Sequence, residues 1–147
     1  MLFDNLGAKD REWSRMLGAL SCDMHFLAIE RMLDSETPIF IAESAFWADI
    51  ARPTLQRILQ DKNVECLEIY CQLDDEIRKQ RFADRVTSGE RHPGHVDHLN
   101  IATGSTGSLS QYAPLKIGEI ITVDTGNFGD AEYATLKKEV GLFCDKP

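Results

Sequence analysis

The sequence predicts an α/β protein, a three-layer αβα domain built on a short parallel sheet of three strands. Two observations support this class. Short, continuously apolar runs alternate along the chain with amphipathic segments of ten residues or more, and such alternation requires parallel strands joined by right-handed crossovers. The chain has 147 residues, of which 43% are hydrophobic, so it is long enough for one core. We therefore expect residues 1–147 to form a single domain.

The first long helix is expected from Asp10 to about Ser35, because apolar residues recur there every three or four positions. Its regular apolar positions are Trp13, Leu17, Leu20, Met24 and Leu27. The periodicity predicts that this stripe, Trp13 included, packs against the core, and we expect Trp47 to pack there too.

Three further helices are predicted. The second runs from Ala51 to about Asp61 with Pro53 in its first turn. The third begins at the N-cap Asp74 and runs to about Thr87, and the last follows a cap at Asp130. Residues 92–114 are rich in glycine, proline and serine, and we expect mostly loop there, with one turn of helix near Leu99.

Three strands are expected at 39–42, 64–71 and 117–123. The run Ile39-Phe40-Ile41-Ala42 is short and wholly apolar, which is typical of a strand buried on both faces. Parallel pairing brings the carboxyl ends of the strands to one edge, where Glu43, Gln72 and Asp124 would meet. Open parallel sheets bind ligands at that edge.

The charge balance excludes several partners. Sixteen basic residues against 24 acidic ones give a net charge of −8, which repels nucleic acid and anionic lipid, so anion binding requires a local basic cluster. No apolar run reaches the roughly 20 residues of a membrane span, and the first residues do not have the pattern of a signal peptide. We expect a cytoplasmic protein with no membrane or nucleic-acid partner, whose four cysteines are reduced.

A basic stripe is predicted on the third helix. Arg78, Arg81 and Arg85 fall within an arc of roughly 60° on a helix that turns about 100° per residue. Forked guanidinium donors suit phosphate oxygens. The alternative is a solvated helix face, neutralised by acidic neighbours such as Asp74 and Asp84. The stripe alone leaves both interpretations open.

The segment after this helix adds a fourth cation, Arg91, between Gly89-Glu90 and Pro93-Gly94. A hinged cationic segment can close over a substrate as a lid, which we place at about 88–114. His92 and His95 are candidate polar lid contacts. His92, His95 and His98 also have a spacing that metal ligands can have. Pro93-Gly94 prevents one helical face from presenting all three, so no metal is expected.

Carboxylates are predicted at the ends of two strands. Glu43, with Ser44 beside it, and Asp124 occupy positions where a carboxylate holds magnesium-bound water or accepts a proton from an attacking hydroxyl. The alternative role is that of a turn former, which we favour for Asp124 because Thr125-Gly126 follows it.

Several segments together resemble the bacterial P-loop ATP-binding proteins of the small-molecule kinase type. The resemblance covers nearly the whole chain, and its most specific part is Arg91-His92-Pro93-Gly94-His95 after the arginine helix. The supporting segments are Leu2-Phe3-Asp4, Asp10-Arg11-Glu12-Trp13-Ser14, Glu43-Ser44-Ala45-Phe46, Arg81-Phe82 through Arg85, Ser88-Gly89-Glu90, Val96-Asp97 and Val123-Asp124-Thr125. The family commonly carries Asn at the position of Ala45.

The resemblance implies ATP and magnesium as cofactors, and phosphoryl transfer to a small molecule. It implies that Arg81, Arg85 and Arg91 are lid cations that stabilise the transferring phosphoryl group, and that Glu43 lies near the acceptor or the magnesium. In the family a strand, a G-x-x-x-x-G-K-[ST] loop and a helix come first. The 147 residues contain no Gly-Lys pair, so we expect an N-terminally incomplete domain, inactive alone, that self-associates through its incomplete sheet.

A second interpretation is a non-catalytic module that uses the arginine stripe to bind an anionic metabolite or a protein partner. Fold-level likeness does not by itself fix chemistry.

Overall fold

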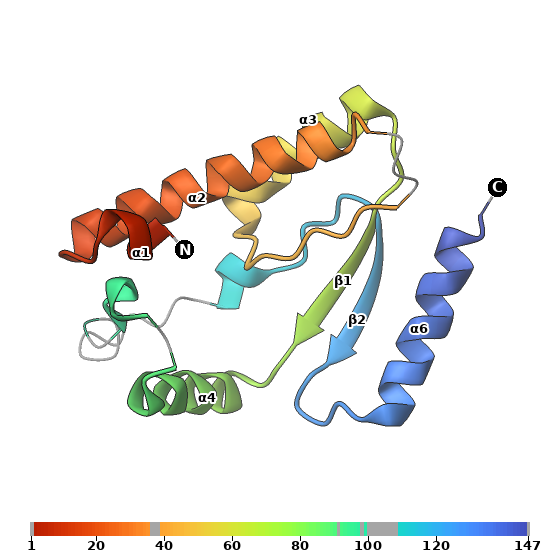
Figure 1. Cartoon of the computed structure of the whole chain (residues 1–147). Coiled ribbons are helices and arrows are strands. Elements are labelled where there is room, and N and C mark those ends of the chain that lie inside the picture. Colours follow the sequence, from red (N-terminus) through yellow and green to blue (C-terminus); the bar gives the residue numbers. More distant parts are fainter. Residues whose placement is uncertain (1, 36–38, 91, 98, 100–108, 147) are drawn as a thin grey trace. The chain divides into compact units, whose positions relative to one another are not determined.

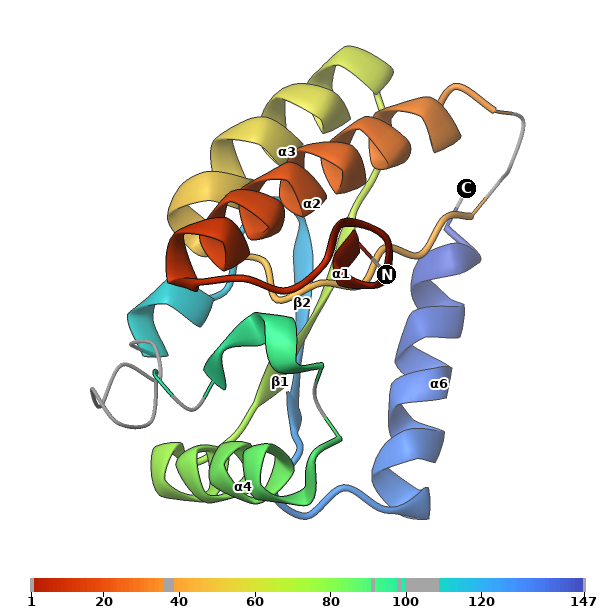
Figure 2. The same ribbon diagram turned by 60° about the vertical axis from the view of Figure 1, so that its left-hand side comes forward.

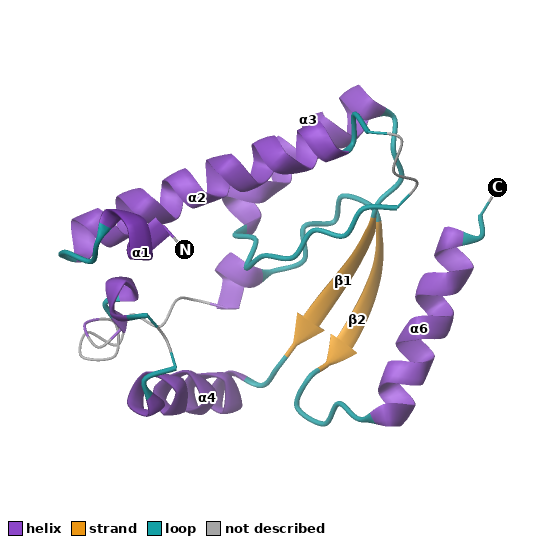
Figure 3. Ribbon diagram, in the orientation of Figure 1, coloured by secondary structure: helices purple, strands orange, loops and turns teal. Residues whose placement is uncertain are grey.

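A computed structural model describes the chain except residues 1, 36–38, 91, 98, 100–108 and 147 (Figure 1). It divides into two compact units. The first contains residues 1–29 and 75–107, and the second contains residues 30–74 and 108–147. Helices and the two strands alternate as Figure 3 shows, which confirms the mixed α/β class.

The first unit is helical in its described residues. It contains α1 (Leu2–Leu6), most of α2 (Arg11–Met32), α4 (Asp75–Ser88) and the short 3₁₀ helix η1 (Pro93–His95). Asp10 caps α2, since its Oδ1 accepts a hydrogen bond from the backbone N–H of Trp13 at 2.9 Å. The indole N–H of Trp13 donates to the carbonyl of Gly7 at 2.9 Å, which ties α2 to the residue after α1. Neither α1 nor η1 was expected from the sequence.

The second unit is built on a parallel pair of strands, β1 (Leu67–Gln72) and β2 (Glu119–Asp124). They run side by side in both views (Figures 1 and 2). The register pairs Leu67 with Glu119 and ends on Gln72 opposite Asp124. The expected parallel pairing is therefore confirmed, and the carboxyl ends of both strands lie at one edge.

The expected first strand is wrong. Residues 39–47 are irregular chain before α3, and the sheet has two strands in the described part of the protein. Ile39 and Ile41 are 57% and 84% exposed rather than buried. A strand needs a hydrogen-bonded neighbour, and hydrophobicity alone does not supply one to this segment.

The remaining helices of this unit are α3 (Ala48–Lys62), η2 (Leu109–Tyr112) and α6 (Asp130–Cys144). Helix α3 begins three residues before the expected start, which places Pro53 inside the helix rather than in its first turn. Its apolar side is buried through Ala51, Leu55 and Ile58. Trp47 precedes α3 and is 48% exposed, so the expectation that it packs in the core is wrong.

The turn that leads into β2 is held by two charged side chains. Both carboxylate oxygens of Glu68 accept backbone N–H groups, from Leu115 at 2.6 Å and from Lys116 at 2.9 Å. The guanidinium of Arg52 on α3 donates to the carbonyl of Leu115 at 2.8 Å. These hydrogen bonds give partners to backbone N–H and C=O groups of the turn that form no bond within the sheet. They also fix the position of the chain just before β2.

The regular apolar stripe of α2 is not the buried face of this helix. Leu20, Met24 and Leu27 are 42%, 54% and 53% exposed, whereas Phe26 and Ile29 are buried. Of the regular positions, Leu17 is buried at 2% and Trp13 is half-buried. The expected packing face of the helix is therefore wrong for most of its length.

Candidate functional site

The arginine stripe lies on α4, in the first unit. Arg78 is already paired, since its Nε and Nη2 donate to Oδ1 of Asp75 at 3.0 and 2.7 Å. Lys79 also contacts Asp75, with its Nζ 2.9 Å from Oδ2. The hydrogen bond from Lys79, and then that from Arg78, lowers the pKa of the Asp75 carboxyl. Arg78 therefore holds the start of α4 through Nε and Nη2.

Arg81 and Arg85 follow on the same helix with exposed side chains. Arg85 forms no hydrogen bond or ion pair through its guanidinium with the described part of the chain. It is therefore the open cation of the stripe. Arg91, the fourth predicted cation, lies outside the described residues, as does His98.

The two candidate lid histidines are packed on an aromatic ring from the start of the chain. His92 stacks on Phe3 with ring centroids 5.3 Å apart and planes 5° apart. His95 meets the same ring edge-on at 5.0 Å. Both distances are typical of favourable aromatic pairs. Phe3 is 8% exposed, and both imidazoles contact its ring.

The ring nitrogens of His92 are also engaged. Its Nδ1 accepts the backbone N–H of Gly94 at 3.0 Å, which caps η1. Its Nε2 lies 3.5 Å from Oδ1 of Asp4. The neutral imidazole that accepts at Nδ1 carries its proton at Nε2, so its one N–H faces the Asp4 carboxylate.

The predicted acceptor-side residues lie in the second unit. Glu43 and Ser44 are exposed on the irregular segment that precedes α3, not at the end of a strand. Asp124 does end β2, and its Oδ1 accepts the N–H of Gly126 at 2.8 Å. This is the turn-forming role favoured by the sequence, and the side chain remains exposed. Thr125 closes the same edge by donating through N and Oγ1 to the carbonyl of Gln72.

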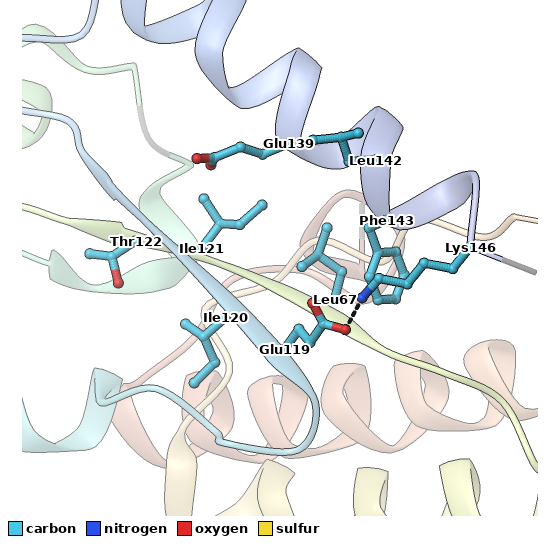
Figure 4. A pocket seen from close by; sticks show the side chains of 9 residues that line it. All are labelled: Leu67, Glu119, Ile120, Ile121, Thr122, Glu139, Leu142, Phe143 and Lys146. Atoms are coloured by element: carbon cyan, nitrogen blue, oxygen red, sulfur yellow. Dashed lines mark hydrogen bonds and ion pairs between the residues drawn. The ribbon is translucent and has the colours of Figure 1, made fainter.

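A separate hollow lies between α6 and the sheet, again in the second unit (Figure 4). Its volume is about 380 Å³, and an ion pair between Lys146 and Glu119 lies in its wall. The other lining residues are mainly apolar: Leu67, Ile120, Ile121, Thr122, Glu139, Leu142 and Phe143. None of the sequence-predicted site residues lines it.

The structure thus groups the predicted residues by unit. Arg78, Arg81, Arg85 and the two lid histidines belong to the first unit, and the three acceptor-side residues to the second. Sequence reasoning missed the contacts that Phe3, Asp4 and Asp75 make. Asp75 had a signal in its spacing of three residues from Arg78. Phe3 and His92 are too far apart in the chain for any periodicity to pair them.

Comparisons with known proteins support a likeness in fold. No protein-family model and no curated protein matches the chain. Among solved structures, a protein described as a "putative kinase" from Chloroflexus aurantiacus matches with a TM-score of 0.74. The match covers 94% of this chain and 77% of that chain, at 27% sequence identity. The fold is kinase-like.

Two further findings concern what the kinase-like fold contains. Within the described residues, no group of three or more His, Cys, Asp or Glu side chains is placed to hold a metal ion. Among the same residues, no helix has both the length and the apolar character needed to cross a bilayer.

Proposed function

We propose that the chain is an ATP-binding, kinase-like P-loop protein whose intact family transfers a phosphoryl group from ATP to a small molecule. We further propose that these 147 residues, which lack a Gly-Lys pair, do not catalyse that transfer alone. The observation that carries the proposal is the match to the Chloroflexus protein over 94% of this chain. The arginine helix followed by Arg91-His92-Pro93-Gly94-His95 adds the sequence support.

The expected lack of activity follows from what phosphoryl transfer needs. A glycine loop supplies backbone N–H donors, a helix N-terminus, a lysine and a magnesium-binding hydroxyl, and catalysis depends almost wholly on such positioning and electrostatics. Lid arginines stabilise charge on the transferring group, but they do not hold the β- and γ-phosphates in place.

The residues present fit the lid side of such a site. Arg85 offers an exposed, unpaired guanidinium to the triphosphate, with Arg81 one turn before it and Arg91 beyond the helix. Arg78, which also holds the first turn of the helix through Asp75, is assigned to the same phosphate-binding side. ATP bound with Mg²⁺ supplies the phosphoryl group. Glu43, Ser44 and Asp124 are assigned to the acceptor and magnesium side.

Calorimetric titration with ATP and with inorganic tripolyphosphate tests the cationic lid. We expect weak, salt-sensitive binding that Arg85→Ala reduces severalfold. Arg15→Ala is the matched control, because Arg15 is an exposed arginine of the same unit on another helix. Equal losses in the two variants would show that only net charge matters, and would contradict an anion site on α4.

Activity is tested by two assays. The 147-residue chain should release no phosphate from ATP above background. A version extended by the in-frame codons that precede Met1 should gain ATP hydrolysis if those codons encode a strand and Gly-Lys-Ser or Gly-Lys-Thr. Turnover by the 147-residue chain at an ordinary enzymatic rate would contradict the proposal. Tight binding of an anionic metabolite without magnesium would favour the non-catalytic module.

A further inference from the structure

The contact between α1 and the candidate lid turn determines whether the lid histidines can reach a ligand. This inference rests on the proposed function, because it concerns the same anion-binding segment. Phe3 of α1 contacts the rings of His92 and His95, at centroid distances of 5.3 and 5.0 Å. Phe3, Val96 and Asp97 are all less than 10% exposed, so the turn is packed rather than laid on the surface.

The packing leaves no spare room at Gly94, which is buried between the two histidines. A Cβ atom added there would lie 2.5 Å from the ring of Phe3, closer than side chains approach in proteins. The ring therefore lies directly against the backbone of the turn. Only glycine permits this contact, so even one added methyl group would separate α1 from the turn.

In this arrangement His92 cannot serve an anion. Its Nδ1 is occupied by the N–H of Gly94, and its remaining N–H faces the carboxylate of Asp4 at 3.5 Å. A phosphate oxygen can accept this N–H only by taking the place of the Asp4 carboxylate oxygen that now lies 3.5 Å from Nε2. The contacts that cap and orient the turn thus also exclude an anionic ligand from its imidazole.

We propose that Phe3 and Asp4 form a latch that holds the His92–His95 turn in an anion-excluding state, so that binding of a polyphosphate to His92 of this turn requires release of α1. Phe3 and Asp4 are positioning residues in this scheme, since they act through His92. The apparent affinity of the turn for a polyphosphate is then its intrinsic affinity multiplied by the fraction of molecules in which the latch is open.

The latch is tested by calorimetric titration of the full 147-residue chain with tripolyphosphate. Phe3→Ala removes the ring, and Asp4→Asn removes the charge beside His92. We expect each variant to bind about three- to tenfold more tightly than the wild type, the change that corresponds to losing one aromatic or charged contact. If Phe3 and Asp4 only stabilised the turn, the same substitutions would weaken tripolyphosphate binding. An increase in affinity therefore distinguishes a latch from a structural role.

Two matched controls test whether a shortened side chain on α1, or a change in net charge, accounts for the change in affinity. Leu6→Ala shortens an exposed side chain of the same helix and should leave the affinity unchanged. Asp23→Asn removes one exposed carboxylate of the same unit, on α2, and corrects for the general effect of net charge. Asp4→Asn must exceed this control, and equal gains in the two variants would overturn the role of Asp4.

The contact itself has a spectroscopic readout. Stacking on Phe3 should shift the ring protons of His92 upfield in NMR spectra, and both Phe3→Ala and Gly94→Ala should abolish that shift. If Arg85→Ala weakens tripolyphosphate binding while the Phe3 and Asp4 variants do not strengthen it, the latch is overturned and the proposed function stands. If no variant binds tripolyphosphate, the anion site itself is overturned.

Discussion

Gly118 has no side chain, and this allows the backbone segments before β1 and β2 to lie close together where the strands begin to pair. The carbonyl of Cys66 accepts the N–H of Glu119 at 3.1 Å, the first bond between the two strands. A Cβ atom on Gly118 would lie 2.1 Å from that same carbonyl oxygen. The two backbone segments that lead into β1 and β2 can therefore approach closely here only because residue 118 is glycine.

Gly118→Ala should therefore destabilise the protein by about 1–3 kcal/mol, because the backbone must move apart where the strands begin to pair. Urea unfolding followed by circular dichroism measures this change. Gly141→Ala is the matched control: a Cβ on this helical residue of α6 has no neighbour within 4 Å. That substitution should be neutral or stabilise by up to about 1 kcal/mol. A Gly118→Ala variant as stable as the wild type would contradict the close approach.

At the scale of elements, α2 shows that periodicity identifies a helix more reliably than its buried face. Its most regular apolar positions are mostly exposed, and irregularly spaced residues such as Phe26 and Ile29 are buried instead. Substitution of two nearby apolar residues of α2, one buried and one exposed, therefore tests which face of the helix is packed.

Ile29→Ala should cost about 2–4 kcal/mol, because Ile29 is 5% exposed and its removal leaves a cavity. Leu27→Ala should change the free energy of unfolding by less than about 0.5 kcal/mol, because Leu27 is 53% exposed. Chemical denaturation of both variants measures the difference. The reverse order would show that the regular stripe is the buried face.

The first turn of α4 should be sensitive to acid through Asp75. Its pKa lies below the ordinary value of 3.8, chiefly because of hydrogen bonds from Lys79 and Arg78. A carboxyl with a lowered pKa in the folded state stabilises that state above its unfolded pKa, and the contribution is lost as the pH falls through the folded value. We expect the first turn to fray below a pH of about 3.8 in NMR chemical shifts.

Asp75→Asn should remove this acid-dependent change and leave the first turn of α4 weakened at neutral pH. Asp84→Asn is the control, because Asp84 lies on the same helix and, among the described residues, its carboxylate accepts a hydrogen bond from the neutral side chain of Gln80 and from no cation. If the wild type and Asp75→Asn respond alike to acid, the ion pairs of Asp75 do not hold the helix start.

At the scale of the whole molecule, a two-stranded sheet leaves strand edges without a strand partner in the described part of the chain. Large apolar side chains are exposed on both strands, with Ile69 at 44% and Ile120 at 39%. Unpaired edges and exposed apolar surface favour association between copies.

We therefore expect the 147-residue chain to self-associate as its concentration rises, with sedimentation velocity as the measurement. Ile69→Lys should shift the distribution toward monomer, because a lysine on an edge strand opposes further pairing. Ala134→Lys, at an exposed position on α6, is the control, because it adds the same single positive charge away from the strands. A chain that stays monomeric at all concentrations would contradict association through the sheet.

The sequence by itself determined the α/β class, the parallel pairing of 64–71 with 117–123, the four long helices and the place of the arginines on one of them. These follow from local periodicity and from the connection rules of parallel strands, and both can be read along the chain. The resemblance to kinases agrees with the kinase-like fold, while the proposed roles of Glu43, Ser44, Asp124 and the arginines stay predictions.

The tertiary structure alone decided which apolar residues are buried and that residues 39–42 have no strand partner in the described part of the chain. It also decided that Asp75 pairs with Arg78 and that Phe3 contacts both His92 and His95. Each of these depends on which distant residues come into contact. Burial, strand pairing and ring stacking are properties of pairs that lie far apart in sequence. A local pattern carries no information about such pairs, because the same periodicity fits either side of a helix.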